Sequence, residues 1–368
     1  MSKKVLSFGE LLLRICPDAG GGWLKENSLP FYVGGAEANV ATALALWGIP
    51  SAYFSALPDN LLAHQLAGYL EEKGVDMSRV LYQGERLGLY FLPKGKDVKN
   101  AGVIYDRDHS SFSALKPGEI DWDAVLADIG WLHFSAISPA LNQQLALVCG
   151  EMLQAAADKK GITISVDLNY RPKLWQYGVA PTAVMPGLVQ YCDLVMGNLW
   201  AAEKMLGIAV DTSLTGTDRK EDYLEHARRS SEAILETFPR VKQVAKTFRF
   251  DRGATGIQYY TAFYSRGGVE AGPRDGAAGL RNAAAGSGDG GGDQLYSSRE
   301  YFSDKIVDKV GSGDCFMAGL IRGISRGQAV QETLEFATAA AFQKLFIPSD
   351  ATDQRAEEIQ KFMTDYGR

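Results

Sequence analysis

The sequence predicts an α/β fold: a layered sandwich in which helices cover both faces of a mainly parallel central sheet, with a small β lid. Apolar or β-branched runs alternate with helical stretches, which is the pattern of βαβ units. The expected strands and helices of this alternation are residues 5–8, 36–47, 131–134, 141–159, 163–167, 194–196 and 201–206. Residues 11–33 and 84–105 break the alternation with Gly, Pro and alternating aromatic residues, so we assign both regions to the lid.

The composition is that of a globular protein. The 368 residues, of which 46% are hydrophobic and 22% charged, suffice for one large domain spanning residues 1–368. No stretch approaches the roughly 20 apolar residues of a membrane-spanning helix. The N-terminus enters a strand-like run at once, without the apolar segment of a secretory signal. We therefore expect a cytoplasmic protein.

Charge and cysteine content limit the partners. A formal net charge of −6 argues against a nucleic-acid surface, although a local basic pocket could still bind a small anion. Cys16, Cys149, Cys192 and Cys315 are widely scattered and form no CxxC pair, which argues against a disulfide framework or a zinc site. The expected partners are small molecules.

The most informative motif is Gly311-Ser312-Gly313-Asp314, in which a strand ends in a tight turn and opens into an apolar helix. Unpaired N–H groups and the helix dipole attract anions at a helix start, and glycines allow a phosphate to approach closely. A carboxylate there could accept the proton of a hydroxyl that attacks the phosphate. We therefore expect Asp314 to be a catalytic base rather than a simple helix cap.

The same tetrapeptide recurs as Gly286-Ser287-Gly288-Asp289. It lies in residues 266–294, a segment rich in Gly, Ala and Asp that we interpret as an inserted, mobile surface loop. The glycines that follow it cannot form an amphipathic helix and so supply no aligned dipole. Asp289 is therefore not the expected base.

These residues resemble the DxxGxGD signature of the ribokinase-like, or PfkB, carbohydrate kinases. The turn Gly34-Gly35-Ala36-Glu37-Ala38-Asn39 resembles the GGxxxN sugar-binding turn of the same family. The resemblance spans nearly the whole chain apart from residues 266–294. It implies a ribokinase-like three-layer sandwich, ATP as phosphate donor and Asp314 as base, with an anion hole formed by Gly311, Ser312 and Gly313 and sugar contacts from Gly34, Gly35 and Asn39.

The resemblance also implies a nucleotide site and two cations. Residues 246–256 resemble the strand and glycine turn that line the nucleotide, which assigns Thr247, Gly253 and Gly256 to ATP together with Asn198; for the glycines, an ordinary hairpin turn is the alternative. Asp308 lies where related enzymes bind a monovalent cation such as K⁺. Mg²⁺ is expected to accompany ATP.

The family's NxxE element, which organises Mg²⁺ through water, is altered in this chain. Asn198-Leu199-Trp200-Ala201 has alanine where the glutamate is expected, and Glu203 follows two residues later. Glu203 is therefore the candidate for a water-mediated contact with Mg²⁺.

Two tyrosines and two arginines suggest an acidic sugar. A guanidinium matches a carboxylate in shape, and tyrosine hydroxyls can bind sugar hydroxyls. The alternative is that the tyrosines alternate along lid strands and the arginines are solvent-exposed. The four candidates are Tyr90, Tyr105, Arg107 and Arg171.

The order of these residues resembles the 2-keto-3-deoxygluconate kinase branch of the family. That resemblance implies phosphorylation of 2-keto-3-deoxygluconate to its 6-phosphate, and it assigns a substrate contact to Asp350, for which a helix cap is the alternative. It also allows a homo-oligomer formed through the β lid.

Three other functions are alternatives for this sequence. Leu174-Trp175 after a DxNxR segment is shared with fructokinases, the second choice, and a catalytically inactive sugar-binding regulator is a non-enzyme alternative. A dinucleotide-dependent oxidoreductase would need a GxGxxG motif after the first strand, and Gly9-Glu10 lacks it.

Overall fold

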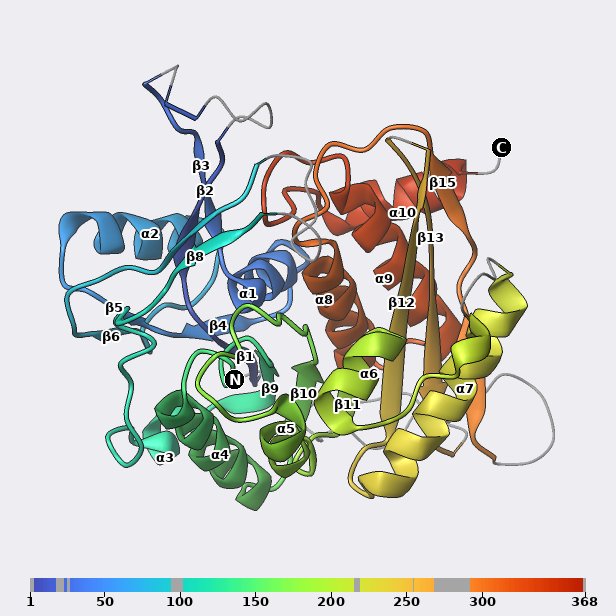
Figure 1. Cartoon of the computed structure of the whole chain (residues 1–368), viewed down its shortest axis with the longest axis horizontal. Helices are drawn as coiled ribbons and strands as arrows, with labels where there is room; N and C mark the ends of the chain where they lie inside the picture. Colours follow the sequence, from blue (N-terminus) through green and yellow to red (C-terminus); the bar gives the residue numbers. More distant parts are fainter. Residues whose placement is uncertain are drawn as a thin grey trace.

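The computed structural model describes residues 3–17, 23–24, 27–93, 102–214, 219–253, 255–267 and 292–366. Its central sheet runs in the order β14-β13-β12-β11-β10-β9-β1-β4, and β15 pairs with β13 (Figure 1). The strands are β1 (Lys4–Phe8), β4 (Ser51–Phe54), β9 (Ile129–Ser135), β10 (Thr163–Asp167), β11 (Leu194–Met196), β12 (Gln243–Arg252), β13 (Gly256–Ser265), β14 (Gln294–Ser297) and β15 (Tyr301–Ser303). The insertion expected at residues 266–294, with its second GSGD copy, lies outside the described residues except at its ends.

The expectation of a mainly parallel sheet is confirmed. Strands β4, β1, β9, β10, β11 and β12 are parallel neighbours, whereas β13, β14 and β15 form an antiparallel edge. The central strands are almost wholly buried, as expected for parallel strands that are covered on both faces.

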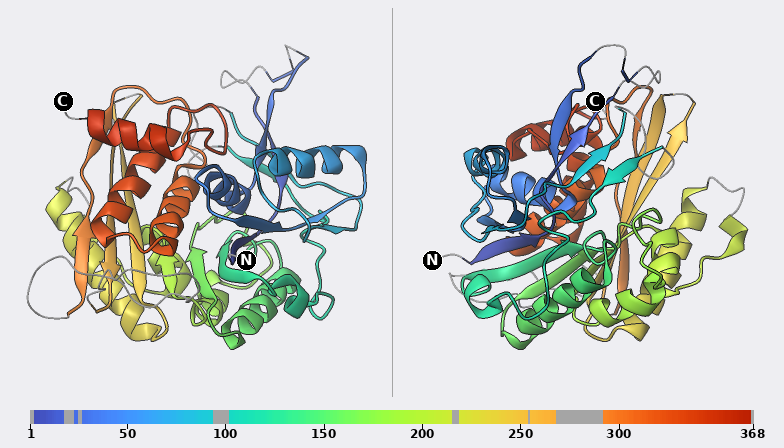
Figure 2. Two further views of the ribbon diagram at one scale, coloured as in Figure 1. Left: turned by 180° about the vertical axis from the view of Figure 1, so that it is seen from behind. Right: turned by 60° about the vertical axis from the view of Figure 1, so that its left-hand side comes forward.

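Helices cover both faces of this sheet (Figure 2). Because side chains alternate along a strand, neighbours such as Trp131 and Leu132 enter different apolar cores. Trp131 packs with α1 (Ala36–Leu46), α8 (Ser312–Ser325), α9 (Val330–Lys344) and α10 (Ala356–Asp365). The core around Leu132 includes α3 (Trp122–Val125), α4 (Gln143–Asp158), α5 (Pro181–Val189), α6 (Leu199–Leu206) and α7 (Lys220–Thr237). The short helix η1 (Thr212–Leu214) lies between α6 and α7 in the chain.

A smaller sheet, here named the lid sheet, lies beside the central one. It consists of β2 (Leu12–Ile15), β3 (Phe31–Gly34), β7 (Leu89–Phe91) and β8 (Ile104–Asp106), in the order β3-β2-β7-β8 (Figure 1). Helix α2 (Leu61–Glu72) packs against it, and β5 (Ala56–Leu57) pairs with β6 (Leu81–Tyr82). These strands lie in the regions expected to form a lid; oligomerisation through them stays a prediction.

Within the part of the chain that the structure describes, no helix has the length and apolar character required to cross a membrane. The site-forming segments follow the carboxyl ends of the parallel strands, where ligands of open α/β sheets bind. Glu10 follows β1, Asp167 ends β10, and Asn198 follows β11. The first residues of α1 and α8 lie together with Glu10, Asp167 and Asn198 at this edge of the sheet.

Candidate active site

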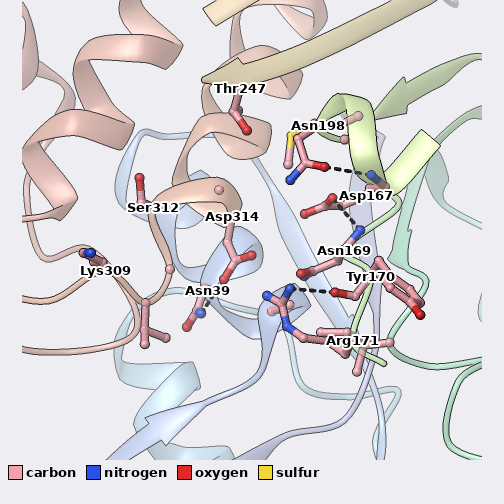
Figure 3. Close-up of a pocket in the computed structure, with 18 of the residues that line it drawn as sticks. Asn39, Asp167, Asn169, Tyr170, Arg171, Asn198, Thr247, Lys309, Ser312 and Asp314 are labelled. Atoms are coloured by element: carbon pink, nitrogen blue, oxygen red, sulfur yellow. Dashed lines mark hydrogen bonds between the residues drawn. The ribbon is translucent and has the colours of Figure 1, made fainter. Parts of the chain in front are cut away.

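A cavity of about 690 Å³ lies between the lid sheet and the start of α8. Figure 3 shows side chains from both halves of the chain pointing into it. The cavity brings together most of the residues that the sequence predicted for the site. These are Gly35, Asn39, Tyr90, Tyr105, Arg107, Arg171, Asn198, Thr247, Gly311, Ser312, Gly313, Asp314 and Asp350.

The phosphate turn matches its sequence in part: the expected helix begins at Ser312, but the strand expected directly before the turn is not formed, because β15 ends at Ser303. Gly311 precedes α8 with a φ of 79°, in the left-handed region that favours glycine. A Cβ at this position would lie 1.8 Å from the carbonyl oxygen of Asp350, so no other residue fits. The Ser312 hydroxyl donates to the carbonyl of Ala341 at 2.9 Å and is held by the scaffold. The first backbone N–H groups of α8 have no acceptor within the helix and suit an anion in the cavity.

Asp314 lies in the first turn of α8 and is 9% exposed. The side-chain amide of Asn39 donates to its carboxylate at 2.7 Å. Burial raises the pKa of Asp314 to about 8, the carboxylates of Asp167 and Glu37 push this pKa the same way, and the Asn39 hydrogen bond opposes the rise. Asp314 can therefore exchange a proton near neutral pH.

Asn198 and Glu203 occupy different environments. The Asn198 side chain caps α6 by accepting from the Ala201 N–H at 2.7 Å, and it faces the cavity. Glu203 does not line the cavity; its carboxylate lies 3.1 Å from the Lys204 ammonium.

Several carboxylates line the cavity, but they are not gathered into a metal-binding cluster among the described residues. No group of three or more His, Cys, Asp or Glu side chains that could hold a metal occurs in the described ranges. The carboxylates of Asp167 and Asp314 both line the cavity. Carboxylate oxygens of this kind are ligands that Mg²⁺ accepts together with water and nucleotide phosphates.

Asp350 connects the cavity to the lid sheet. The Tyr90 hydroxyl donates to the Asp350 carboxylate at 2.6 Å, and this carboxylate is 1% exposed. Gly34 lies just outside the cavity lining; a Cβ there would come 2.8 Å from the same carboxylate, so the glycine makes room for it. The helix-cap alternative for Asp350 is wrong, because α10 begins only at Ala356, after Arg355.

The two arginines expected to face the sugar differ in their partners. Arg107 donates from Nε to the carboxylate of Glu10 at 2.6 Å, and both side chains are buried. Arg171 donates to the carbonyl of Tyr170 at 3.1 Å. In the described part of the chain, no carboxylate lies within ion-pair distance of Arg171. The guanidinium of Arg171 is therefore the one suited to a ligand anion.

Asp308 lies beneath the cavity rather than in its lining. Its side chain is fully buried and forms an ion pair with the guanidinium of Arg14 from β2. Its other oxygen accepts from the Val310 N–H at 3.1 Å. The carboxylate expected to lie near a monovalent cation is thus paired with a side chain of the protein.

Gly253 and Gly256 also lie outside the cavity lining: Gly253 follows the end of β12, and Gly256 is the first residue of β13. Gly253 has a φ of 65°, and a Cβ on Gly256 would lie 2.5 Å from the carbonyl oxygen of Arg252. Both glycines meet the demands of the hairpin, as in the alternative considered for them. Residues 247–251 of β12 line the cavity instead.

Sequence reasoning missed several cavity residues, namely Glu10, Glu37, Asp167, Trp200, Arg249, Tyr259 and Lys309. Some of them lie inside the sequence motifs whose other residues were predicted for the site. Glu37 belongs to the GGxxxN turn, is buried, and accepts from the N–H and hydroxyl of Ser135 at 2.9 and 2.6 Å. Lys309 lies inside the DxxGxGD string and pairs with Asp251 at 2.7 Å.

Comparisons with known proteins agree with this geometry. The model of the family described as pfkB family carbohydrate kinase matches residues 2–352. A 2-dehydro-3-deoxygalactonokinase of Haloferax volcanii is 27% identical, with 99% of this chain and 97% of that protein covered. A probable fructokinase-2 of Arabidopsis thaliana is 25% identical over 98% of this chain and 97% of its own.

Solved structures show the same similarity. The crystal structure of a 2-dehydro-3-deoxygluconokinase from Thermotoga maritima superposes with a TM-score of 0.81. It is 34% identical to this chain, and the match covers 98% of this chain and 99% of that one. The similarity therefore extends through the lid sheet, the central sheet and the phosphate turn.

Proposed function

We propose that this chain, which belongs to the pfkB family of carbohydrate kinases, transfers the γ-phosphate of ATP to a hydroxyl of a 2-keto-3-deoxy sugar acid. The best candidate is 2-keto-3-deoxygluconate, with its 6-phosphate as product. The observation that carries the proposal is the shared cavity of Asp314, the candidate base, and Arg171, a guanidinium with no carboxylate partner among the described residues.

The start of α8 is the proposed phosphate site. Gly311, Ser312 and Gly313 present backbone N–H groups and the positive end of the helix dipole to the cavity, which suits the charge that develops on a transferring phosphoryl group. Thr247 and Asn198, which face the cavity from β12 and the start of α6, are proposed to contact the nucleotide. Mg²⁺ bound by the phosphates would neutralise part of their charge.

Asp314 is the proposed base. As the sugar oxygen forms its bond to phosphorus and the bond to the leaving ADP breaks, the hydroxyl proton passes to the Asp314 carboxylate. The Asn39 amide holds this carboxylate at 2.7 Å and keeps one of its oxygens oriented. Its raised pKa, about 8, makes Asp314 a stronger base than an exposed aspartate once it is ionised.

Arg171 is the proposed partner of the substrate carboxylate. Arg107 also lines the cavity, but Glu10 already balances its charge, so we assign Arg107 a hydrogen-bonding role toward the sugar acid. The hydroxyls of Tyr90 and Tyr105 lie on the lid side, where sugar hydroxyls would bind. A neutral sugar would leave the partly buried guanidinium of Arg171 without an ion-pair partner, which favours an acid over fructose.

Two relatives named above act on epimeric keto-deoxy acids, a gluconate and a galactonate form. The carboxylate and the keto-deoxy group are common to both substrates, and these are the groups that Arg171 and its neighbours would recognise. The gluconate form is our first choice because the more similar of the two relatives is the gluconokinase. The fructokinase relative keeps fructose as the second candidate.

An assay of ADP release over a panel of acceptors tests this function. The panel contains 2-keto-3-deoxygluconate, its galactonate epimer, gluconate, fructose and ribose, and phosphorus NMR identifies the phosphorylated oxygen. We expect one or both keto-deoxy acids to exceed fructose in kcat/KM by at least about 30-fold, the effect of one charged hydrogen-bonding partner. Equal or better use of fructose would reassign the substrate.

A further inference from the structure

We propose that Arg14 supplies from within the chain the positive charge expected of a monovalent cation at Asp308, so that phosphoryl transfer by this kinase does not depend on K⁺. The inference rests on kinase activity but not on the identity of the sugar. It also makes Arg14 a positioning residue, because its guanidinium joins the lid sheet to the phosphate turn.

Both oxygens of the Asp308 carboxylate already have partners within the protein. One oxygen contacts the Arg14 guanidinium, and the other accepts from the Val310 N–H at 3.1 Å. Both side chains are fully buried, with 0% of each exposed. A K⁺ ion that binds this carboxylate would have to displace the Arg14 guanidinium. Otherwise the ion would lie beside the guanidinium, and the two positive charges would repel each other strongly in this low-dielectric environment. The residues present therefore do not fit a monovalent cation at Asp308.

The formal charges of the buried groups around Arg14 already balance. Arg14 also lies 3.2 Å from the carboxylate of Asp350, which is 1% exposed. Lys344 of α9 is equally buried, and its ammonium donates to the carbonyl of Ile347 at 3.2 Å. Two carboxylates, Asp308 and Asp350, thus share a buried site with two cationic side chains. A bound K⁺ would add an uncompensated buried charge, which is costly.

The same contacts connect the lid sheet to the catalytic turn. Arg14 of β2 and Tyr90 of β7 are register neighbours. The Tyr90 hydroxyl donates to one oxygen of the Asp350 carboxylate, and the Arg14 guanidinium forms an ion pair with the other. The backbone of Asp350 in turn packs against Gly311, where a Cβ would come within 1.8 Å of its carbonyl oxygen. Loss of Arg14 would leave two buried carboxylates beside the start of α8 with only Lys344 as a cation. The N–H groups proposed to hold the phosphoryl group would then lose their fixed position.

The first experiment uses the unmodified protein. Turnover is compared in 100 mM KCl and in choline chloride at the same ionic strength, with whichever sugar the enzyme phosphorylates. Thermal unfolding in the two salts is followed without any sugar. We expect turnover to differ by less than about 2-fold and the unfolding temperature not to respond specifically to K⁺. Stimulation by K⁺ of about 3-fold or more, or K⁺-specific stabilisation, would overturn the inference.

The second experiment removes the internal cation. In choline chloride, the turnover of Arg14→Ala should be at least about 100-fold below that of the wild type. Addition of K⁺ or guanidinium chloride should raise the turnover of this variant by at least about 10-fold. A folded Arg14→Ala protein that neither ion rescues would contradict the charge role. Arg14→Lys, which keeps the charge, should retain measurable turnover without a K⁺ requirement; K⁺-dependent turnover of this variant would also contradict it.

Arg79 provides a matched control. It too pairs with two carboxylates, those of Asp76 and Asp128, and is only 13% exposed, but it does not line the cavity. Arg79→Ala should lose stability and gain no response to K⁺. Each response to K⁺ is a ratio of turnover in two salts with the same sugar, so it does not depend on which sugar is the natural substrate. A failure of the Arg14 inference can thus be told from a failure of the proposed substrate.

Discussion

The side-chain amide of Asn39 donates a hydrogen bond of 2.7 Å to the carboxylate of Asp314, although 275 positions separate the two residues in the chain. Asn39 lies in α1, which follows the glycine turn at the end of the lid sheet, and Asp314 lies in the first turn of α8. The two helices pack side by side. This bond brings the two signature motifs into one site, and its effect on the base can be measured.

Asp314→Asn should reduce turnover by about 100-fold or more while the fold is kept. The amide preserves the shape and can still bond to Asn39, but it cannot accept the substrate proton. Steady-state ADP release measures the loss, and circular dichroism checks the fold. Asp289→Asn, which alters the same tetrapeptide elsewhere in the chain, is the control and should leave turnover unchanged. Near-normal turnover of a folded Asp314→Asn protein would remove Asp314 from the mechanism.

Asp314→Asn should also stabilise the protein against unfolding at alkaline pH. The native pKa of Asp314, about 8, lies above the ordinary value of 3.8. Between these values the native state binds a proton that the unfolded chain has lost, so the stability of the wild type falls as the pH rises toward 8. Asp314→Asn removes the ionisable group, so the stability of this variant does not fall with pH for this reason. Urea unfolding at pH 8.5 should therefore show a higher midpoint for the variant, and the gain should shrink toward pH 4; a lower midpoint at pH 8.5 would be inconsistent with the raised pKa.

The pH dependence of kcat/KM should reflect the ionisation of Asp314. Only the carboxylate form can accept a proton, so the rate should rise with pH to a plateau with a midpoint near 8. Asn39→Leu removes the hydrogen bond that lowers the pKa of Asp314, and its midpoint should move to higher pH. A flat profile between pH 6 and 9, or a midpoint that falls in the Asn39 variant, would argue that another group controls the rate.

Lys246 should destabilise the protein at neutral pH. Its side chain is 1% exposed, and its ammonium donates to the Ser230 hydroxyl at 3.2 Å. Burial lowers the pKa of Lys246 from 10.5 to about 7. Between these values the unfolded chain binds a proton that the native state lacks, so the stability of the wild type rises with pH, and the cost is complete below pH 7.

Lys246→Met should therefore raise the free energy of unfolding at pH 6 by on the order of 2 kcal/mol, because an apolar chain of similar size replaces a buried ammonium. The gain should fade as the pH approaches 10.5. Urea unfolding at pH 6, 8 and 10 measures it, and Lys305→Met, at an exposed lysine, should change nothing. A loss of stability in Lys246→Met at pH 6 would mean that the ammonium is better solvated than its burial indicates.

The parts of this molecule that the sequence predicts are those with a local pattern. A short apolar run predicts the strand at residues 163–167, and a glycine turn before an apolar run predicts the helix whose first turn holds Asp314. The contrast with the second GSGD copy likewise depends only on neighbouring residues. Local chemistry was therefore enough to choose Asp314 as the candidate base.

Partners that are distant in the chain could not be predicted in this way. Arg14 and Asp308 are 294 positions apart, and Glu10 and Arg107 are 97 apart. No periodicity signals such pairs, because tertiary packing alone brings the side chains together. The pairing of Arg107 with Glu10, an anion inside the protein, therefore has no signal in the sequence. The turn residues Gly253 and Gly256 are visible in the sequence, whereas the length of the β12–β13 hairpin is not.

The most direct test of the proposed function is the ratio of kcat/KM for 2-keto-3-deoxygluconate to kcat/KM for fructose, measured for the wild type and for Arg171→Leu. If Arg171 binds the substrate carboxylate, the wild type should favour the acid, and the substitution should lower this ratio by at least about 30-fold, mainly through loss of activity on the acid. Equal impairment on both substrates, or a wild type that uses fructose as efficiently as the acid, would contradict the proposal that this kinase recognises a sugar acid through Arg171.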